Sequence, residues 1–86
     1  MIKKIFYNNC ESKLVKHKVE VLEDDIVKVL GKETLYKIEC VHNSDISFYF
    51  GTCAIIDIDT YTEGCETIPI SDLVFIDREF YDPDHF

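Results

Sequence analysis

The sequence predicts a mainly β protein, built as a small antiparallel barrel or a strongly curved sheet. Apolar residues recur at every second position over most of the chain, the spacing that places side chains on one face of a strand, and helical periodicity is weak. Polar turn-forming residues separate these short apolar runs, as in small all-β folds. The 86 residues, of which 47% are hydrophobic, suffice for one small core, so residues 1–86 are expected to form a single domain.

Residues 1–24 are predicted to be an N-terminal β extension. Apolar residues between Ile2 and Phe6 indicate a first strand, which ends at the turn-forming pair Asn8-Asn9. From residue 14 to residue 22 apolar and charged residues alternate, and this alternation predicts a half-buried strand. One face of that strand carries Val15, His17, Val19 and Val21.

The main body of the fold is predicted over residues 25–77. It begins with a short strand from Ile26 to Leu30, which Gly31 closes. Residues 35–50 are predicted to form an antiparallel hairpin, because alternation on both sides flanks a polar turn, His42-Asn43-Ser44-Asp45.

Further strands are predicted at residues 54–58, 67–70 and 74–76. Thr62-Glu63-Gly64 turns the chain between the first two, and Pro69 places the second at an edge or corner because proline cannot donate a ladder hydrogen bond. Ser71-Asp72-Leu73 indicates one helical turn before the last strand. The predicted core positions are Val19, Val21, Val29, Tyr36, Ile38, Phe48, Phe50, Ile56 and Ile76.

The spacing of apolar and turn residues over residues 25–77 resembles that of SH3-like small barrels. The segments that carry the resemblance are Ile26-Val-Lys-Val-Leu30, Gly31, Tyr36-Lys-Ile38 and Ile68-Pro-Ile-Ser-Asp-Leu-Val-Phe-Ile76. The resemblance implies a 3₁₀ turn at residues 71–73 that lets the last strand close against the first. It also implies a binding module of unspecified partner, because such barrels serve many unrelated roles. The aromatic peptide-binding cluster of signalling SH3 domains is not recognisable.

Charge is distributed unevenly along the chain. Residues 1–37 hold 8 Lys and 6 acidic residues, whereas residues 38–86 hold 11 acidic residues and a single basic one, Arg78, giving 1 − 11 = −10. A segment this acidic repels phosphates, so direct binding to DNA or RNA is disfavoured. The acidic surface either keeps the protein soluble or is shaped for a basic partner, and its one-sidedness favours a partner.

The cysteines and histidines are the candidates for metal or acid–base chemistry. Cys10, Cys40, Cys53 and Cys65 contain no close pair of the kind that structural zinc sites use, so reduced thiols and no metal are expected. Cys40 and His42 share a strand face and are the residues that a Cys-His nucleophile would use. The sequence indicates neither a third group that would orient the histidine nor a pocket, so we expect no enzymatic activity and no cofactor.

Two acidic segments are the predicted protein-binding residues. Asp57 and Asp59 are expected on one strand face, without the residue order of a calcium loop. The segment after the last strand mixes aromatic residues with carboxylates, and it either folds back over the core or serves as an anchor strip for a partner. The predicted contact residues are Asp57, Asp59, Asp77, Glu79, Phe80, Tyr81, Asp82, Asp84 and Phe86.

These features together predict a small acidic protein-binding module of the cytoplasm, since no apolar run approaches the length of a membrane helix or a signal peptide. The expected partner is a basic protein, such as a nuclease or another nucleic-acid-handling protein, which the module inhibits. Immunity proteins, antitoxins and phage-encoded inhibitors of bacterial defence share this general character. An SH3-like adaptor or a subunit of a larger complex, including a homo-oligomer, is the alternative. A small enzyme or metal-binding protein that uses Cys and His is a third.

Overall fold

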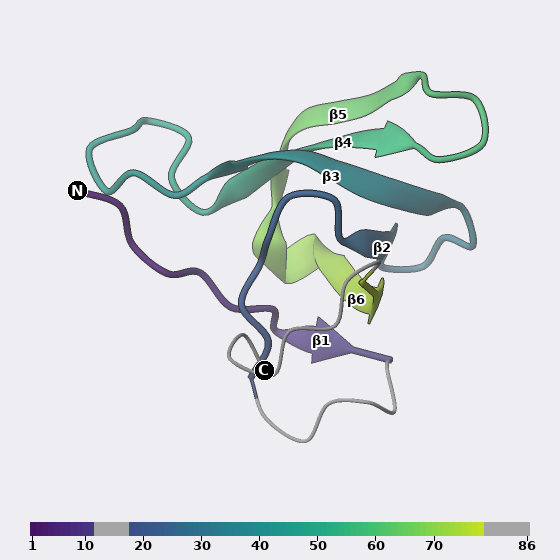
Figure 1. Ribbon diagram of the computed structural model, residues 1–86, viewed down its shortest axis with the longest axis horizontal. Helices are drawn as coiled ribbons and strands as arrows, with labels where there is room; N and C mark the ends of the chain where they lie inside the picture. Colours follow the sequence, from purple (N-terminus) through teal and green to yellow (C-terminus); the bar gives the residue numbers. More distant parts are fainter. Residues whose placement is uncertain (12–17, 79–86) are drawn as a thin grey trace.

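Six strands form one sheet in the computed structural model, which describes residues 1–11 and 18–78 (Figure 1). Neighbouring strands are antiparallel, except that β1 and β6 are parallel. The prediction of a mainly β fold is therefore confirmed. In sheet order the strands are β1 (Asn9–Cys10), β6 (Leu73–Asp77), β2 (Ile26–Val29), β3 (Leu35–His42), β4 (Thr52–Asp57) and β5 (Glu63–Pro69).

A 3₁₀ turn, η1 (Ile70–Asp72), leads the chain from β5 to β6, which pairs with β2. Two backbone hydrogen bonds hold this turn: Ile70 N donates to Gly51 O at 3.1 Å, and Leu30 N donates to Asp72 O at 2.8 Å. The predicted helical turn near Ser71 is confirmed. Within the described residues no ladder joins β5 to β1, so the sheet is open and the predicted closure into a barrel is not confirmed.

The N-terminal extension pairs through isolated bridges, not through a long strand. Ile2 bridges to Ser44, and Phe6 bridges to Glu20. The strand itself lies at Asn9–Cys10, where a turn was predicted, because this segment pairs with β6. Residues 12–17, which include His17 and the first four residues of the strand predicted at 14–22, lie outside the described residues. In the rest of that segment Glu20 forms the bridge to Phe6.

The predicted hairpin over residues 35–50 is wrong, because β3 pairs with β4 and not with residues 46–50. Residues 43–51 form successive turns, in which Ser47 N donates to Ser44 O and Phe50 N donates to Ser47 O. Gly51 adopts a φ of +86°, which glycine tolerates, and the chain then enters β4. Apolar and polar residues alternate over residues 46–50 as they do in a strand. The buried side chains opposite β3 are nevertheless those of Cys53 and Ile55 in β4.

The hydrophobic core joins the inward side chains of the sheet to the N-terminal extension. Val19, Val21 and Ile38 are buried as predicted, and Val29 and Tyr36 are half-buried against the core. The buried apolar residues are Tyr7, Val19, Val21, Val27, Ile38, Cys53, Ile55, Ile68, Ile70, Leu73, Val74 and Phe75.

Four of the predicted core positions are wrong. Phe48 is 95% exposed and Phe50 is exposed, because both lie in the turns between β3 and β4. Ile56 and Ile76 are only half-buried, since the preceding residues, Ile55 and Phe75, take the buried positions in β4 and β6. A shift of one residue in the register of a strand exchanges its two faces.

A buried polar cluster formed by Tyr7, Asp25 and Arg78 connects the two ends of the described chain. Asp25 is 1% exposed and accepts hydrogen bonds from Tyr7 Oη at 2.7 Å and from Leu22 N at 3.0 Å. Arg78 Nε donates to Asp25 Oδ1 at 2.6 Å and one terminal nitrogen of its guanidinium donates to Asp25 Oδ2 at 2.9 Å, so the pair is bidentate.

The surroundings of Arg78 complete this cluster. A terminal nitrogen of its guanidinium also donates to Glu20 O at 2.7 Å, and its Cζ lies 5.3 Å from the centroid of the Phe75 ring. Burial by itself lowers the pKa of Arg78, but the hydrogen bond and the charge of Asp25 outweigh burial and raise it. The guanidinium is therefore a fixed positive charge beside Asp25.

Replacing Arg78 by methionine tests this cluster. We expect Arg78→Met to lower the free energy of unfolding by about 3–5 kcal/mol, because it leaves a buried carboxylate without its cation. Urea unfolding followed by circular dichroism measures the change. Lys37→Met is the control, since Lys37 pairs with the exposed Asp24 and its loss should cost less than about 1 kcal/mol. Equal losses in the two variants would contradict a special role for Arg78.

Because of Cys53, we expect the free energy of unfolding to fall in alkali. Burial raises the pKa of its thiol from 9.0 to about 12. A raised pKa stabilises the folded state below the unfolded pKa, and this contribution is lost as the pH rises from about 9 to about 12. Over that window the free energy of unfolding should fall more steeply in the parent than in Cys53→Ala, by up to about 1.4 kcal/mol per pH unit. Urea midpoints measured from pH 8 upward, at about half-unit steps, check this, and parallel curves would refute it.

Candidate functional site

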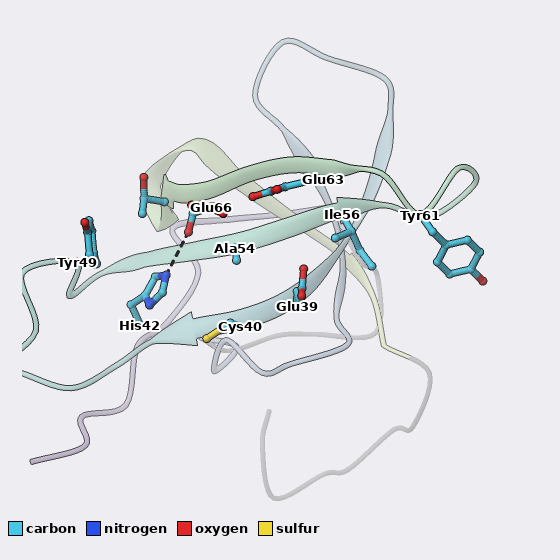
Figure 2. A pocket seen from close by; sticks show the side chains of 10 residues that line it. Glu39, Cys40, His42, Tyr49, Ala54, Ile56, Tyr61, Glu63 and Glu66 are labelled. Carbon is cyan, nitrogen blue, oxygen red and sulfur yellow. Dashed lines mark hydrogen bonds between the residues drawn. The ribbon is translucent and has the colours of Figure 1, made fainter.

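An open groove of about 710 Å³ lies on the outer face of β3, β4 and β5 (Figure 2). Figure 2 shows Tyr49 at one end and Tyr61 at the other, with glutamates from β3 and β5 between them. This acidic groove is lined by Glu39, Cys40, His42, Tyr49, Ala54, Ile56, Tyr61, Glu63, Glu66 and Thr67.

A bulge in β3 determines which of its residues reach the groove. Ile38 pairs with Ile55 and Cys40 pairs with Ala54, so Glu39 is the extra residue. Alternation restarts one residue later, and Val41 packs against the core while Cys40 and His42 line the groove. Cys40 was expected on the apolar face beside Ile38, and the bulge is the reason why it lies on the other face.

Two bulges in β5 give its glutamates the same outward placement. Cys53 pairs with Ile68 and Ile55 pairs with Cys65, so Glu66 and Thr67 together face one residue of β4, and both line the groove. Gly64 is the extra residue of the second bulge, and a Cβ there would lie 2.7 Å from the Tyr36 ring. Glycine therefore permits the close packing of this edge strand on β3.

His42 and Tyr49 form an aromatic wall at one end of the groove. The His42 Nε2 atom lies 3.1 Å from Glu66 O, and since a carbonyl oxygen only accepts, the proton of the imidazole is on Nε2 (dashed line in Figure 2). The ring centroids of His42 and Tyr49 are 5.7 Å apart, and Phe48 meets Tyr49 edge-on at 5.4 Å. The bulged carbonyl of Glu66 thus fixes the orientation of the wall.

The groove is negative, and its described lining contains no Lys or Arg. A hydrogen bond between the carboxyl groups of Glu63 and Glu66 raises the pKa of Glu63, and the negative charges of Glu66 and Glu39 raise it further. Exposed carboxylates from β3 and β5 thus give the groove a negative charge, which a bound cation would reduce.

An apolar loop, defined as Ile46, Phe48 and Phe50, adjoins the groove. Ile46 is 87% exposed and Phe48 is 95% exposed, although such side chains bury large apolar areas in a core. The chain start lies beside the loop, because Ile2 bridges to Ser44 and the Met1 ammonium lies 2.9 Å from Asp45 Oδ1. Tyr49 belongs to the same turns and to the groove lining, so it joins the two surfaces.

Cys40 and His42 line the same groove, as their predicted common face required. Among the described residues, however, the His42 ring is hydrogen-bonded to a backbone carbonyl and not to a carboxylate, so no Cys-His-acid arrangement is formed there. The part of the chain that the structure describes also holds no cluster of three or more His, Cys, Asp or Glu residues suited to a metal ion.

The predicted contact residues are only partly described. Asp57 ends β4, and its Oδ1 accepts hydrogen bonds from Asp59 N at 2.8 Å and Thr60 N at 3.2 Å, so this carboxylate caps a turn. Asp59 is exposed in that turn and does not share a strand face with Asp57. Asp77 is exposed at the end of β6. The other predicted residues, Glu79, Phe80, Tyr81, Asp82, Asp84 and Phe86, lie outside the described residues.

Sequence reasoning missed the groove because bulges are not visible in the alternation of residues. Glu63 was predicted only as part of a turn, and Glu66, Tyr49 and Tyr61 were not among the predicted contact residues. Their common signal is weak: acidic and aromatic residues that recur after His42, where positive charge is nearly absent.

The pKa of Glu63 provides a direct test of the groove. Replacing Glu66 by glutamine removes the neighbouring charge, so the pKa of Glu63 should fall towards its ordinary value. Titration of the side-chain carboxyl carbon by NMR measures it. Glu39→Gln is the matched control and should lower the pKa of Glu63 less, because the charge of Glu39 acts on Glu63 more weakly than Glu66 does. An unchanged Glu63 titration in Glu66→Gln would show that the two carboxyl groups do not interact.

Comparisons of the chain with family models, with curated proteins and with solved structures give no match. Among the described residues, no helix has the length and apolar character needed to span a membrane.

Proposed function

We propose that the protein is a small binding module that docks onto a basic protein partner through the apolar loop and the acidic groove. The observation that carries this proposal is the continuity of the two surfaces. Phe48 packs on Tyr49, and Tyr49 packs on His42 in the groove wall. One contiguous face thus combines exposed apolar side chains with carboxylates that have no cation beside them in the lining.

The apolar loop supplies short-range affinity. A fully exposed Phe or Ile side chain gains about 1.5–3 kcal/mol when it is buried, and exposed apolar patches mark interaction sites. Phe48 and Ile46 have almost their whole surface available. In the proposal they are the anchors that insert into the partner, as aromatic residues do at binding hot spots.

The acidic groove supplies orientation and speed of association. The net charge of −8 includes 1 − 11 = −10 in residues 38–86, and Glu39, Glu63 and Glu66 of the groove belong to that segment. Long-range attraction accelerates encounter with a positive surface and is screened over about 8 Å at physiological salt. The association rate should therefore fall as salt increases.

A nucleic-acid-handling protein is the proposed partner, and inhibition is the proposed effect. Such proteins present basic grooves that recognise phosphates, and an acidic surface with an apolar anchor can occupy them, as in immunity, antitoxin or phage anti-defence proteins. An SH3-like relationship is also a proposal: the path from β2 through β5, then η1, then β6 beside β2 is the order expected for such folds. An adaptor or a subunit of a larger complex remains the alternative. The identity of the partner distinguishes this alternative from an inhibitor.

Capture of the partner and kinetics with matched variants test the proposal. The partner is isolated with the tagged protein from its own cells, and binding is then measured by surface plasmon resonance. Phe48→Ala should weaken binding at least tenfold, mainly through faster dissociation, while its free energy of unfolding changes by less than about 0.5 kcal/mol. Glu66→Lys should slow association more than Asp59→Lys, which makes the same charge change outside the groove.

The same experiment contains the outcomes that contradict the proposal. If Phe48→Ala and Glu66→Lys both bind like the parent, the interface is elsewhere. Asp59→Lys and a truncation after Arg78 then test the contact residues expected from the sequence. The truncation keeps Arg78, because this residue holds Asp25 in the folded protein.

A further inference from the structure

We infer that the acidic groove binds an arginine side chain of the partner, stacked on the aromatic wall of His42 and Tyr49 with its guanidinium at Glu63 and Glu66. The inference rests on the proposed function in one respect: a basic protein supplies the arginine. Beyond the proposed function, the inference specifies the side chain that the groove recognises and the position of its stem and its charged group. The apolar loop has no part in it, so the two can fail separately.

The shape of the groove suits a long side chain with an apolar stem and a charged head. Its floor presents Ala54 and Ile56 of β4, against which the methylenes of an arginine stem can pack (Figure 2). Its volume of about 710 Å³ is in the range of sites that bind small groups, and it is open on one side, so the backbone of a partner can pass outside it.

The charge of the groove favours a cationic occupant. Glu63 and Glu66 come from β5 and Glu39 comes from β3, so carboxylates stand on two sides of the floor. Glu63 and Glu66 repel each other when both are ionised, and this repulsion is relieved by a cation placed between them. The lining contains no Lys or Arg that would fill this role internally.

The aromatic wall selects arginine among the cations. A planar guanidinium stacks on an aromatic face and donates in two directions at once, whereas the ammonium of lysine is a compact, strongly hydrated point charge. Hydrogen bonding of His42 to Glu66 O holds the wall beside one of the carboxylates, so stacking and charge-assisted hydrogen bonding are available to the same group.

Short peptides give the direct test. The probes are acetyl-Gly-Arg-Gly-amide, the lysine analogue, and the citrulline analogue, which keeps the shape of arginine and removes its charge. Amide NMR spectra of the full chain are recorded during titration. The arginine peptide should shift the amides of residues 39–42, 54–56 and 63–67 with saturation. The lysine peptide should bind more weakly, and the citrulline peptide should not saturate.

Variants of the protein separate the groove from general charge. Glu66→Gln and Tyr49→Leu should each raise the dissociation constant for the arginine peptide about three- to fivefold. Asp59→Asn makes the same charge change as Glu66→Gln in an exposed turn outside the groove lining and should leave the constant unchanged. Equal binding of the citrulline peptide, or an equal loss in Asp59→Asn, would overturn the inference. So would shifts of the same amides by Mg²⁺ at lower concentration than by the peptide.

Failure of this inference is distinguishable from failure of the proposed function. If the partner is captured and Phe48→Ala abolishes capture, but the arginine peptide does not bind, the docking proposal stands and the arginine site is rejected. If the peptide binds the groove as described, but Phe48→Ala and Glu66→Lys leave the kinetics of the captured partner unchanged, the docking proposal is rejected. The preference of the groove for arginine then stands, but the arginine does not come from the captured partner.

Discussion

The ion pair between Asp25 and Arg78 is the interaction on which the arrangement of the chain depends. It places a residue just before β2 against the residue just after β6, and Tyr7 of the N-terminal extension donates to the same carboxylate. Such a pair is costly to bury, and it is tolerated here because hydrogen bonds satisfy the carboxylate from several directions. The cluster therefore fixes the extension over the core and positions the end of the described chain.

Irregularities in the sheet, more than its regular parts, create the candidate site. The bulge at Glu39 turns Cys40 and His42 outward, and the bulges of β5 turn Glu63 and Glu66 towards the same side. The same features protect β5 as an edge strand, because charges, bulges and Pro69 all discourage pairing with another strand. An edge that resists self-association can carry acidic residues that attract a different protein.

The proposed function uses surfaces that the fold itself does not need. The apolar loop contributes nothing to the core, and the glutamates of the groove raise each other's energy. The folded state would be more stable if the side chains of the apolar loop were buried and if the glutamates of the groove were paired with lysines. The combination of both costs on one contiguous face is the physical reason for proposing that this face binds a partner, and arginine is the proposed group that relieves the second cost.

Local spacing, local backbone chemistry and composition are sufficient to predict the mainly β class, the 3₁₀ turn near Ser71, the edge position of Pro69 and the charge asymmetry. Its alternation also located Val19, Val21 and Ile38 in the core. Three features depend on contacts between distant segments: the pairing of β3 with β4 and not with residues 46–50, the exposure of Phe48, and the common groove of Glu39, Glu63 and Glu66. The pairing of strands depends on the total burial that each register gives, and a single bulge exchanges the two faces of the residues that follow it in the strand. Alternation within one strand therefore predicts neither its pairing partner nor the position of a bulge.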